Sequence, residues 1–240
     1  MRLSIRATLG SAALFLVATV GAAHAVPLAS LHASNVGISA LGFDFDASTN
    51  TITLRETWTA TGPGIVQITG LDDNVAYTVV KIITNSSGVT WTSFAQELLD
   101  PEGFADGADD PPPLFAPPGF TSSNDTDGLS FAQGFGIPRT STVFGSVLVD
   151  ELEGRDFLDF FGGSLLNGGV DTMNFGVSDN NGLGSDVCDG DVCPNQPFLL
   201  VQRPNARSVP NGVPQPGSLL LLGIGLLGAA FVAHRRLAGR

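Results

Sequence analysis

The chain has 240 residues and is acidic, with 23 Asp and Glu against 11 Lys and Arg and a formal net charge of −12 at pH 7. The charge is uneven: residues 26–212 hold every acidic residue but only six of the basic ones, a formal net charge of −17. Such a surface repels nucleic acid and anionic lipid headgroups, which excludes a nucleic-acid-binding function. It favours solubility and cations, although an acidic surface is also ordinary for an exported protein.

Residues 1–25 have the organisation of a secretory signal peptide. Basic residues stand at the start, an apolar run covers residues 12–20, and the segment ends in Ala23-His24-Ala25. A small-x-small ending of this kind predicts cleavage after Ala25. The alternative is an uncleaved anchor, for which the apolar run is short. The sequence therefore predicts export.

Residues 26–208 are predicted to form one exported domain, mainly β, with the architecture of an antiparallel, jelly-roll-like β-sandwich. β-Branched and aromatic residues are frequent there, and Asn-Gly, Asp-Gly and other glycine turns recur. No long segment has the apolar period of a helix. Several short strands at this spacing are typical of a sandwich. The predicted strands cover residues 51–59, 77–84, 89–94, 142–149, 172–177 and 198–202.

Three further expectations concern the arrangement of this domain. Residues 77–84 and 89–94 flank the turn Asn85-Ser86-Ser87-Gly88 and are predicted to pair as a hairpin. Residues 100–128, rich in proline, glycine and acids, are predicted to form a long surface excursion. Residues 150–161 fit a short helix or a strand, and the sequence leaves that choice open.

The three largest ring side chains on predicted strands are Trp58, Tyr77 and Trp91. The preferred interpretation is that they fill the core of the sandwich, as aromatic residues on strands usually do. The alternative is that they stack on sugar rings in a carbohydrate-binding module.

Histidine usage argues against an enzyme. After removal of the signal peptide, His32 is the single histidine ahead of the C-terminal tail, and it lies near the mature N-terminus, where disorder is expected. There is no Gly-x-Ser-x-Gly motif and no histidine set for catalytic zinc. A pair of acidic residues suited to glycoside hydrolysis remains an alternative. We expect no catalytic residue and no cofactor.

Cys188 and Cys193 enclose four residues. In an exported protein such a pair is expected to form a disulfide, which closes a small loop and contributes about 2 kcal/mol. A redox-active pair usually has two intervening residues, so that alternative has little support.

Two acidic clusters are candidates for calcium binding. One contains Asp125 and Asp127, and the other contains Asp186 and Asp189. Calcium prefers several convergent oxygen ligands. Neither cluster has the complete spacing of an EF-hand, and Asp-Gly and Asn-Gly also make ordinary turns. Turns are the preferred interpretation, and calcium is the alternative.

The C-terminus has three parts: a Pro- and Gly-rich stalk at residues 209–217, an apolar helix expected at 218–234, and a basic tail at 235–240. The uncharged run from Ser218 to Ala233 would extend roughly 24 Å as a helix, slightly less than the hydrocarbon core of a bilayer. Arg235, Arg236 and Arg240 are expected to stay in the cytoplasm by the positive-inside rule. The helix is therefore predicted to hold the exported domain at the membrane.

This tail resembles the PEP-CTERM sorting signal, in which a Val-Pro-Glu-Pro type motif precedes an apolar helix and an arginine cluster. The motif reads Val213-Pro214-Gln215-Pro216-Gly217, and Gln215 stands where glutamate is usual. The resemblance implies recognition by exosortase, a membrane-embedded cysteine transpeptidase of Gram-negative bacteria that make exopolysaccharide. The altered residue puts cleavage, more than membrane insertion, in question.

The sequence thus predicts an exported surface or extracellular-matrix protein with a structural or adhesive role in an exopolysaccharide or biofilm setting. Its expected partners are an exosortase-like enzyme, the membrane through the C-terminal helix, and exopolysaccharide. Two alternatives remain. One is a carbohydrate-binding module or secreted glycoside hydrolase, and the other is an anchored surface protein whose tail is never cut.

Overall fold

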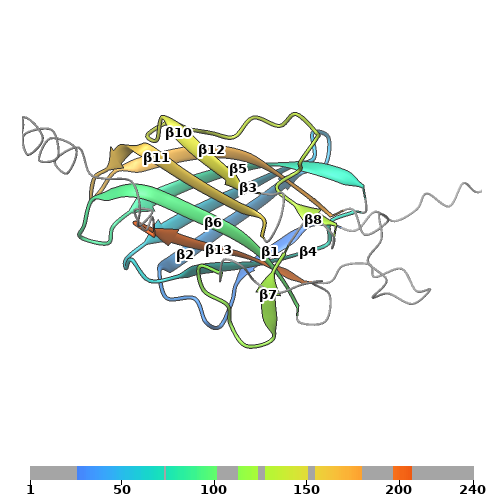
Figure 1. The fold of residues 1–240 in the computed structure, drawn as a ribbon, viewed down its shortest axis with the longest axis horizontal. Helices are drawn as coiled ribbons and strands as arrows, with labels where there is room; N and C mark the ends of the chain where they lie inside the picture. The colour runs from blue at the N-terminus through green and yellow to red at the C-terminus, as the bar shows by residue number, and fades with distance from the viewer. Residues whose placement is uncertain are drawn as a thin grey trace, which may run out of the picture.

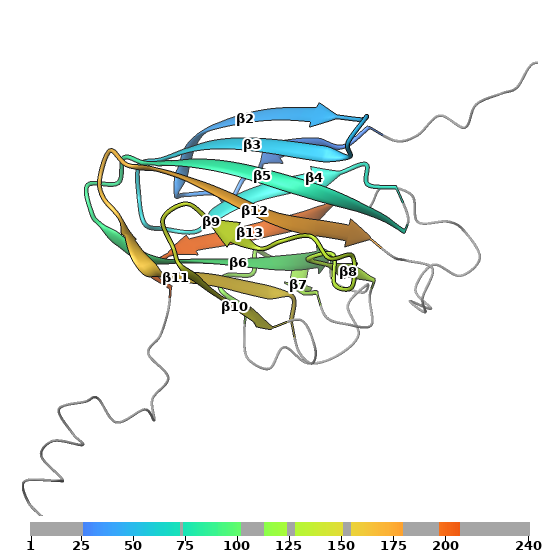
Figure 2. The ribbon, with the colours of Figure 1, turned by 90° about the horizontal axis from the view of Figure 1, so that it is seen from above.

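The computed structural model describes residues 26–72, 74–101, 113–123, 128–150, 155–179 and 197–206, which form thirteen β-strands in two stacked sheets (Figures 1 and 2). No helix occurs within these ranges. Accordingly, no described segment is a helix long and apolar enough to cross a membrane. The prediction of a mainly β domain with two stacked sheets is confirmed. The predicted signal peptide and C-terminal helix lie outside the described residues.

The first sheet has the strand order β1-β4-β13-β6-β11-β10, and β7 adds to β6. Every neighbouring pair in it is antiparallel. Its strands are β1 (Leu28–Leu31), β4 (Gly64–Thr69), β6 (Trp91–Pro101), β7 (Phe120–Ser122), β10 (Ser146–Asp150), β11 (Phe157–Leu165) and β13 (Phe198–Pro204). The last described strand of the chain therefore lies in the interior of the sheet, between β4 and β6.

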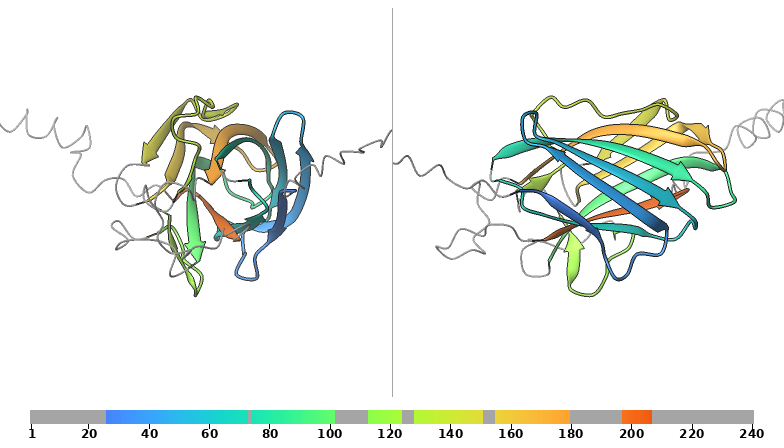
Figure 3. Two further views of the ribbon diagram at one scale, coloured as in Figure 1. Left: turned by 90° about the vertical axis from the view of Figure 1, so that its right-hand side faces the viewer. Right: turned by 180° about the vertical axis from the view of Figure 1, so that it is seen from behind.

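The second sheet has the order β2-β3-β5-β12-β8, with β9 also beside β12. The right-hand view of Figure 3 shows it from the opposite side to Figure 1. Its strands are β2 (Ile38–Asp46), β3 (Thr51–Trp58), β5 (Val75–Asn85), β8 (Leu129–Ser130), β9 (Thr140–Ser141) and β12 (Val170–Asp179). One pair, β3 with β5, is parallel, so the expectation of a wholly antiparallel sandwich is wrong there. The reason is that β4 crosses to the first sheet between them, and β5 returns beside β3 in the same direction.

The predicted hairpin is also wrong, although both of its strands exist. β5 lies in the second sheet and β6 in the first, so the turn between them joins the two layers. Asn85 fixes this turn: its Nδ2 donates to the carbonyls of Val89 (2.8 Å) and Leu165 (3.1 Å), and its Oδ1 accepts from the Ser87 amide (3.0 Å). A glycine at 88 with φ of +83° completes the turn. A short turn signal in sequence fits an arch between sheets as well as a hairpin.

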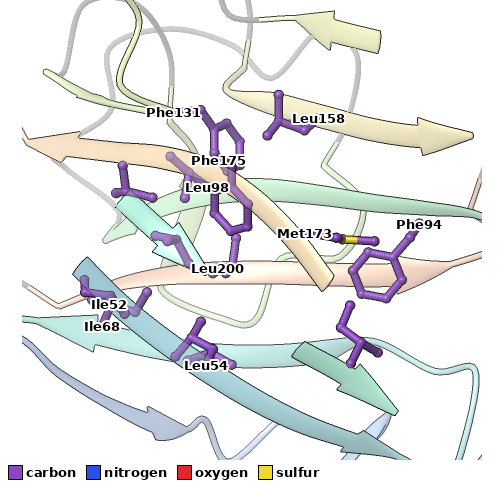
Figure 4. Packing of buried hydrophobic residues seen from close by; sticks show 14 of the residues in the cluster. Ile52, Leu54, Ile68, Phe94, Leu98, Phe131, Leu158, Met173, Phe175 and Leu200 are labelled. Carbon is purple, nitrogen blue, oxygen red and sulfur yellow. The ribbon is translucent and has the colours of Figure 1, made fainter. Parts of the chain in front are cut away.

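Strand alternation puts a continuous apolar core between the two sheets. On β3, for example, Ile52, Leu54 and Trp58 face inward and are fully buried. Figure 4 shows side chains from both sheets, including Leu98, Phe175 and Leu200, meeting in this core. Trp58, Tyr77 and Trp91 all belong to it, so the core interpretation is confirmed and these rings are not available for stacking on a ligand.

Residues 113–123 cover part of the outer face of the first sheet. Leu114 and Phe120 pack against a second apolar cluster of Ile65, Leu99, Leu199 and Val201. The carboxylate of Glu97 fixes the segment, because it accepts hydrogen bonds from the Leu114 amide (2.5 Å) and the Ser122 hydroxyl (2.9 Å). The described part of the predicted excursion is therefore a packed flap that includes β7.

The open choice between helix and strand at residues 150–161 is resolved in favour of strands for Asp150 and for residues 157–161, and residues 151–154 lie outside the described part of the chain. β10 ends at Asp150, β11 begins at Phe157, and the two strands pair with each other. Residues 142–149 are only partly as predicted, because β9 ends at Ser141 and β10 begins at Ser146.

Candidate functional site

Four polar side chains meet inside the apolar core, and we call them the polar centre: Glu56 from β3, Lys81 from β5, Gln96 from β6 and Gln202 from β13. None of the four is more than 2% exposed. They come from both sheets, so the polar centre connects the two layers of the sandwich.

Strand alternation dictates this convergence. Lys81 lies between the inward-facing Val79 and Ile83 on β5, and Gln202 follows the inward-facing Leu200 by two positions on β13. Glu56 occupies the inward position between Leu54 and Trp58 in the same way. A residue on the inner face of a sandwich strand has no route to solvent, so these polar groups must satisfy one another.

The hydrogen bonds form a single network. Lys81 Nζ donates to Gln96 Oε1 (2.7 Å) and to Gln202 Oε1, and it lies 3.5 Å from Glu56 Oε1. The Nε2 of Gln202 donates to the same Glu56 oxygen at 3.0 Å. The indole Nε1 of Trp58 donates to the other carboxylate oxygen, Oε2, at 2.9 Å. The three donors of the lysine ammonium thus face three oxygens.

Burial lowers the pKa of Lys81 to about 8, and the attraction of Glu56 only partly offsets this effect. The ammonium also lies over two aromatic rings, with Nζ 5.3 Å from the centroid of Phe94 and 5.8 Å from that of Phe175. The amine of Lys81 is therefore much closer to its neutral form at neutral pH than a surface lysine would be.

The polar centre was not predicted from the sequence. On β3 the alternation continues through Arg55, Glu56 and Thr57, with Glu56 facing inward. The available signal was the position of single polar residues at inward phases of otherwise apolar strands.

The exit of the chain from the sandwich is a second feature of functional interest. Asn205 follows β13 in a left-handed conformation (φ 54°), and its Oδ1 accepts a hydrogen bond from the Thr92 amide at 2.8 Å. Its Nδ2 donates to the carbonyl of Thr90 at 3.2 Å, and its own amide donates to Ser93. The start of β6 therefore holds the end of β13 at the point where the chain leaves towards its C-terminal segment.

A half-open pocket of about 180 Å³ lies beside β9 and β10 and is lined in part by Arg139, Ser141 and Phe160. Of the two serines in its lining, Ser141 is already engaged, because its Oγ donates to the buried carboxylate of Asp171 at 2.7 Å and accepts from the Phe144 amide at 2.8 Å. These bonds hold the loop between the two strands and leave Ser141 little capacity for a ligand.

His32 is ordered, against the expectation of disorder. It directly follows β1, its Nδ1 accepts a hydrogen bond from the Ser34 amide (3.2 Å), and its ring meets Phe120 edge to face. The Nδ1 of His32 is thus already engaged by the backbone of the turn that follows β1. In the described part of the chain, no three His, Cys, Asp or Glu side chains group as metal ligands.

The other predicted sites lie outside the described residues and stay predictions. They are the cleavage site at Ala23 and Ala25, the disulfide of Cys188 and Cys193, the calcium candidates Asp125, Asp127, Asp186 and Asp189, the motif Val213, Pro214, Gln215, Pro216 and Gly217, and the basic residues Arg235, Arg236 and Arg240.

Comparison with known proteins bears on the C-terminal segment. No curated protein and no solved structure gave a significant match to the chain. Residues 212–236 match the family model of the PEP-CTERM protein-sorting motif. The match begins six residues after Ala206, the last described residue of the sandwich. The chain therefore carries a PEP-CTERM protein-sorting motif at its C terminus, which implies a protein that is exported and sorted to the cell surface by exosortase.

Proposed function

We propose that this protein is a non-enzymatic structural or adhesive component of the cell surface or of an exopolysaccharide matrix, released from its membrane tether by an exosortase-like enzyme. The observation that carries the proposal is the sorting motif at residues 212–236, placed directly after a sandwich domain. The predicted signal peptide at residues 1–25 is the second part of the same export route.

The short connection between domain and motif supports this function. From Ala206 to Ser218, where the predicted helix begins, an extended chain spans at most roughly 40 Å. While the tail is in the membrane, the sandwich is therefore confined to the membrane surface. Cleavage near Pro216 would free the whole domain.

The position of β13 supports folding before processing. The first sheet is incomplete until residues 198–204 pair with both β4 and β6. Because these residues precede the motif, every strand of the first sheet is available to the domain while the predicted helix still holds it, so folding does not require cleavage of the tail.

A structural role is also supported by the way the polar groups are used. The polar centre is enclosed, with exposures of 2% or less, so a substrate from solvent has no access to it. The strands β4, β13, β6 and β11 are neighbours in the first sheet, whereas β5 and β12 are neighbours in the second, so the chain passes back and forth between the sheets as it does in a jelly roll. β1 is added at the edge of the first sheet, and β2 and β3 are added at the edge of the second.

That topology gives a second candidate, a carbohydrate-binding module, since lectin domains are among the proteins that use jelly rolls. This is an argument from fold alone and names no binding residue. Glycan-array binding of the purified domain tests it, and release of reducing sugar tests the hydrolase variant.

The test of the main proposal is the intact mass and the location of the mature protein in its native host. A matched variant replaces Pro214, Gln215 and Pro216 with alanine. We expect native protein that starts at Val26 and ends near Pro216, found at the surface or in the medium, and variant protein that is full-length at its C terminus and retained in the membrane. If both proteins keep Arg240, the tail is a plain anchor and the sorting part of the proposal is wrong.

A further inference from the structure

The polar centre has the components of an acyl-transfer reaction. Lys81 Nζ contacts Gln202 Oε1, so the amine lies against the carboxamide group whose carbon is bonded to that oxygen. Both side chains are fully buried. A neutral amine held against an amide carbonyl in a dry site is a nucleophile placed beside its electrophile.

Glu56 bridges the two groups that must exchange a proton. Its Oε1 lies 3.5 Å from Lys81 Nζ and 3.0 Å from Gln202 Nε2, the nitrogen that would leave. The bond from Trp58 Nε1 to Oε2 fixes the orientation of the carboxylate. One oxygen can therefore take a proton from the attacking amine and deliver it to the departing one.

We propose that the polar centre forms an intramolecular amide bond between Lys81 and Gln202, with Glu56 as the proton carrier. A bond forms between Nζ and the side-chain carbonyl carbon of Gln202, and the bond from that carbon to Nε2 breaks. The proton lost by Nζ passes through Glu56 to Nε2, which leaves as ammonia. The step is a transamidation without oxidation or reduction, and it needs no cofactor.

The surroundings favour this outcome over hydrolysis. Lys81 and Gln202 are both fully buried, and the rings of Phe94 and Phe175 lie within 6 Å of Nζ, so bulk water does not reach the carbonyl carbon. The pKa of Lys81, lowered to about 8 by burial, makes the neutral nucleophile available near neutral pH.

The amine of Lys81 attacks Gln202 and not Gln96. The two glutamines differ in the group that faces their Nε2, the nitrogen that would leave. Gln96 Oε1 also contacts Lys81 Nζ at 2.7 Å, but its Nε2 faces the sulfur of Met173 at 4.0 Å. A thioether cannot supply the proton that the departing ammonia requires. Gln96 is thus a positioning residue that holds the amine.

The bond would join β5 in one sheet to β13 in the other. β13 is the strand that leads to the sorting motif, so a pull on the tail would reach a strand that is covalently tied to the opposite layer. The inference does not depend on the proposed function, since the chemistry needs only the folded sandwich.

The intact mass of the denatured full-length chain tests the proposal. We expect a mass lower by one ammonia than the sequence requires, beyond any change from signal cleavage or a disulfide. Because a bonded Lys81 resists trypsin, digestion should give residues 56–139 joined to residues 156–207. A full mass overturns the proposal. So does loss of water, which would place the bond on Glu56.

Branched peptides exclude the other source of ammonia loss, succinimide formation at sites such as Asn167-Gly168, which joins no two peptides. Gln202→Met, Lys81→Met and Glu56→Gln should each abolish the branched peptide. The matched control Gln67→Met, on β4 and outside the polar centre, should retain it. A branched peptide that survives Gln202→Met overturns the proposal. The wild-type mass and digest decide the question even if a variant does not fold.

Discussion

The indole nitrogen of Trp58 donates to Glu56 Oε2 at 2.9 Å, although the two residues are neighbours on the same face of one strand. The other carboxylate oxygen accepts from Gln202, 146 positions further along the chain. The bond from Trp58 on β3 thus orients the carboxylate that accepts a hydrogen bond from Gln202 on β13, the last described strand. Side-chain networks of this kind rigidify a core only when every member is satisfied.

The ion pair in the polar centre should be costly to break from one side. In the Gln202→Met background, where the proposed amide cannot form, Lys81→Met removes the positive charge and leaves Glu56 buried without its partner, which we expect to lower the free energy of unfolding by about 3–5 kcal/mol. Urea denaturation measures this loss. In the same background, Lys81→Met/Glu56→Leu, which removes both charges, should recover a substantial part of it. A Lys81→Met/Gln202→Met variant within about 1 kcal/mol of Gln202→Met would contradict a stabilising pair.

Stability should rise with pH wherever the Lys81 amine is free. Burial lowers its pKa in the folded chain from the ordinary 10.5 to about 8, so between these values the unfolded chain binds more protons than the folded one. This contribution to the free energy of unfolding is fully present above pH 10.5 and is lost as the pH falls through about 8. The raised pKa of Tyr77, caused by burial, acts in the opposite direction above pH 10, which limits the useful window to pH 8–10.

The rise of stability with pH should be measured in the Gln202→Met variant, because in the wild type the proposed amide would remove the titrating amine of Lys81. Urea denaturation of Gln202→Met should show increasing stability from pH 8 to 10. Lys81→Met/Gln202→Met is the control and should lack that increase. Equal pH profiles for the two variants would contradict the lowered pKa.

The arch between β5 and β6 should depend on one side chain. Asn85→Ala leaves the carbonyls of Val89 and Leu165 without their side-chain donor, and we expect a loss of about 2–3 kcal/mol. Ser86→Ala is the matched control, because Ser86 is exposed in the same turn and should change stability by less than about 0.5 kcal/mol. Thermal and urea unfolding compare the two. Equal effects would show that the arch is held by its backbone alone.

That arch illustrates what sequence could and could not predict. The β-branched and aromatic residues of 51–59, 172–177 and 198–202 predicted β3, β12 and β13, because the preference of a segment for a strand is a local property of its sequence. The partner of a strand depends on contacts distant in sequence. Asn85 reaches Leu165, eighty positions away, and no local pattern reports that bond. The same holds for the polar centre, whose members are predictable as inward-facing but not as neighbours.

The indole ring of Trp58 should leave no room for a side chain at position 64, which is a glycine. A Cβ at position 64 would overlap the indole ring and would lie 2.9 Å from Ile38 Cγ1. Gly64→Ala therefore forces the ring or the strand to move, at an expected cost of about 1–3 kcal/mol. In Gly42→Ala, the control on β2, the added Cβ meets Arg55 Cβ at an ordinary 3.4 Å and should cost little. Near-ultraviolet circular dichroism, which reports the tryptophan environment, should change for Gly64→Ala and not for Gly42→Ala.

The exit of the chain provides a final test, in which two substitutions separate backbone conformation from hydrogen bonding. Asn205→Gly loses the side-chain bonds to Thr92 and Thr90 but adopts the left-handed backbone easily, whereas Asn205→Ala loses the bonds and also strains the backbone. Because Asn205 is exposed, we expect a loss of about 1 kcal/mol for glycine and about 1 kcal/mol more for alanine. Urea unfolding gives both values. If the two variants are equally stable, the positive φ at residue 205 contributes nothing, and the end of β13 is held by its strand pairing with β4 and β6 rather than by its cap.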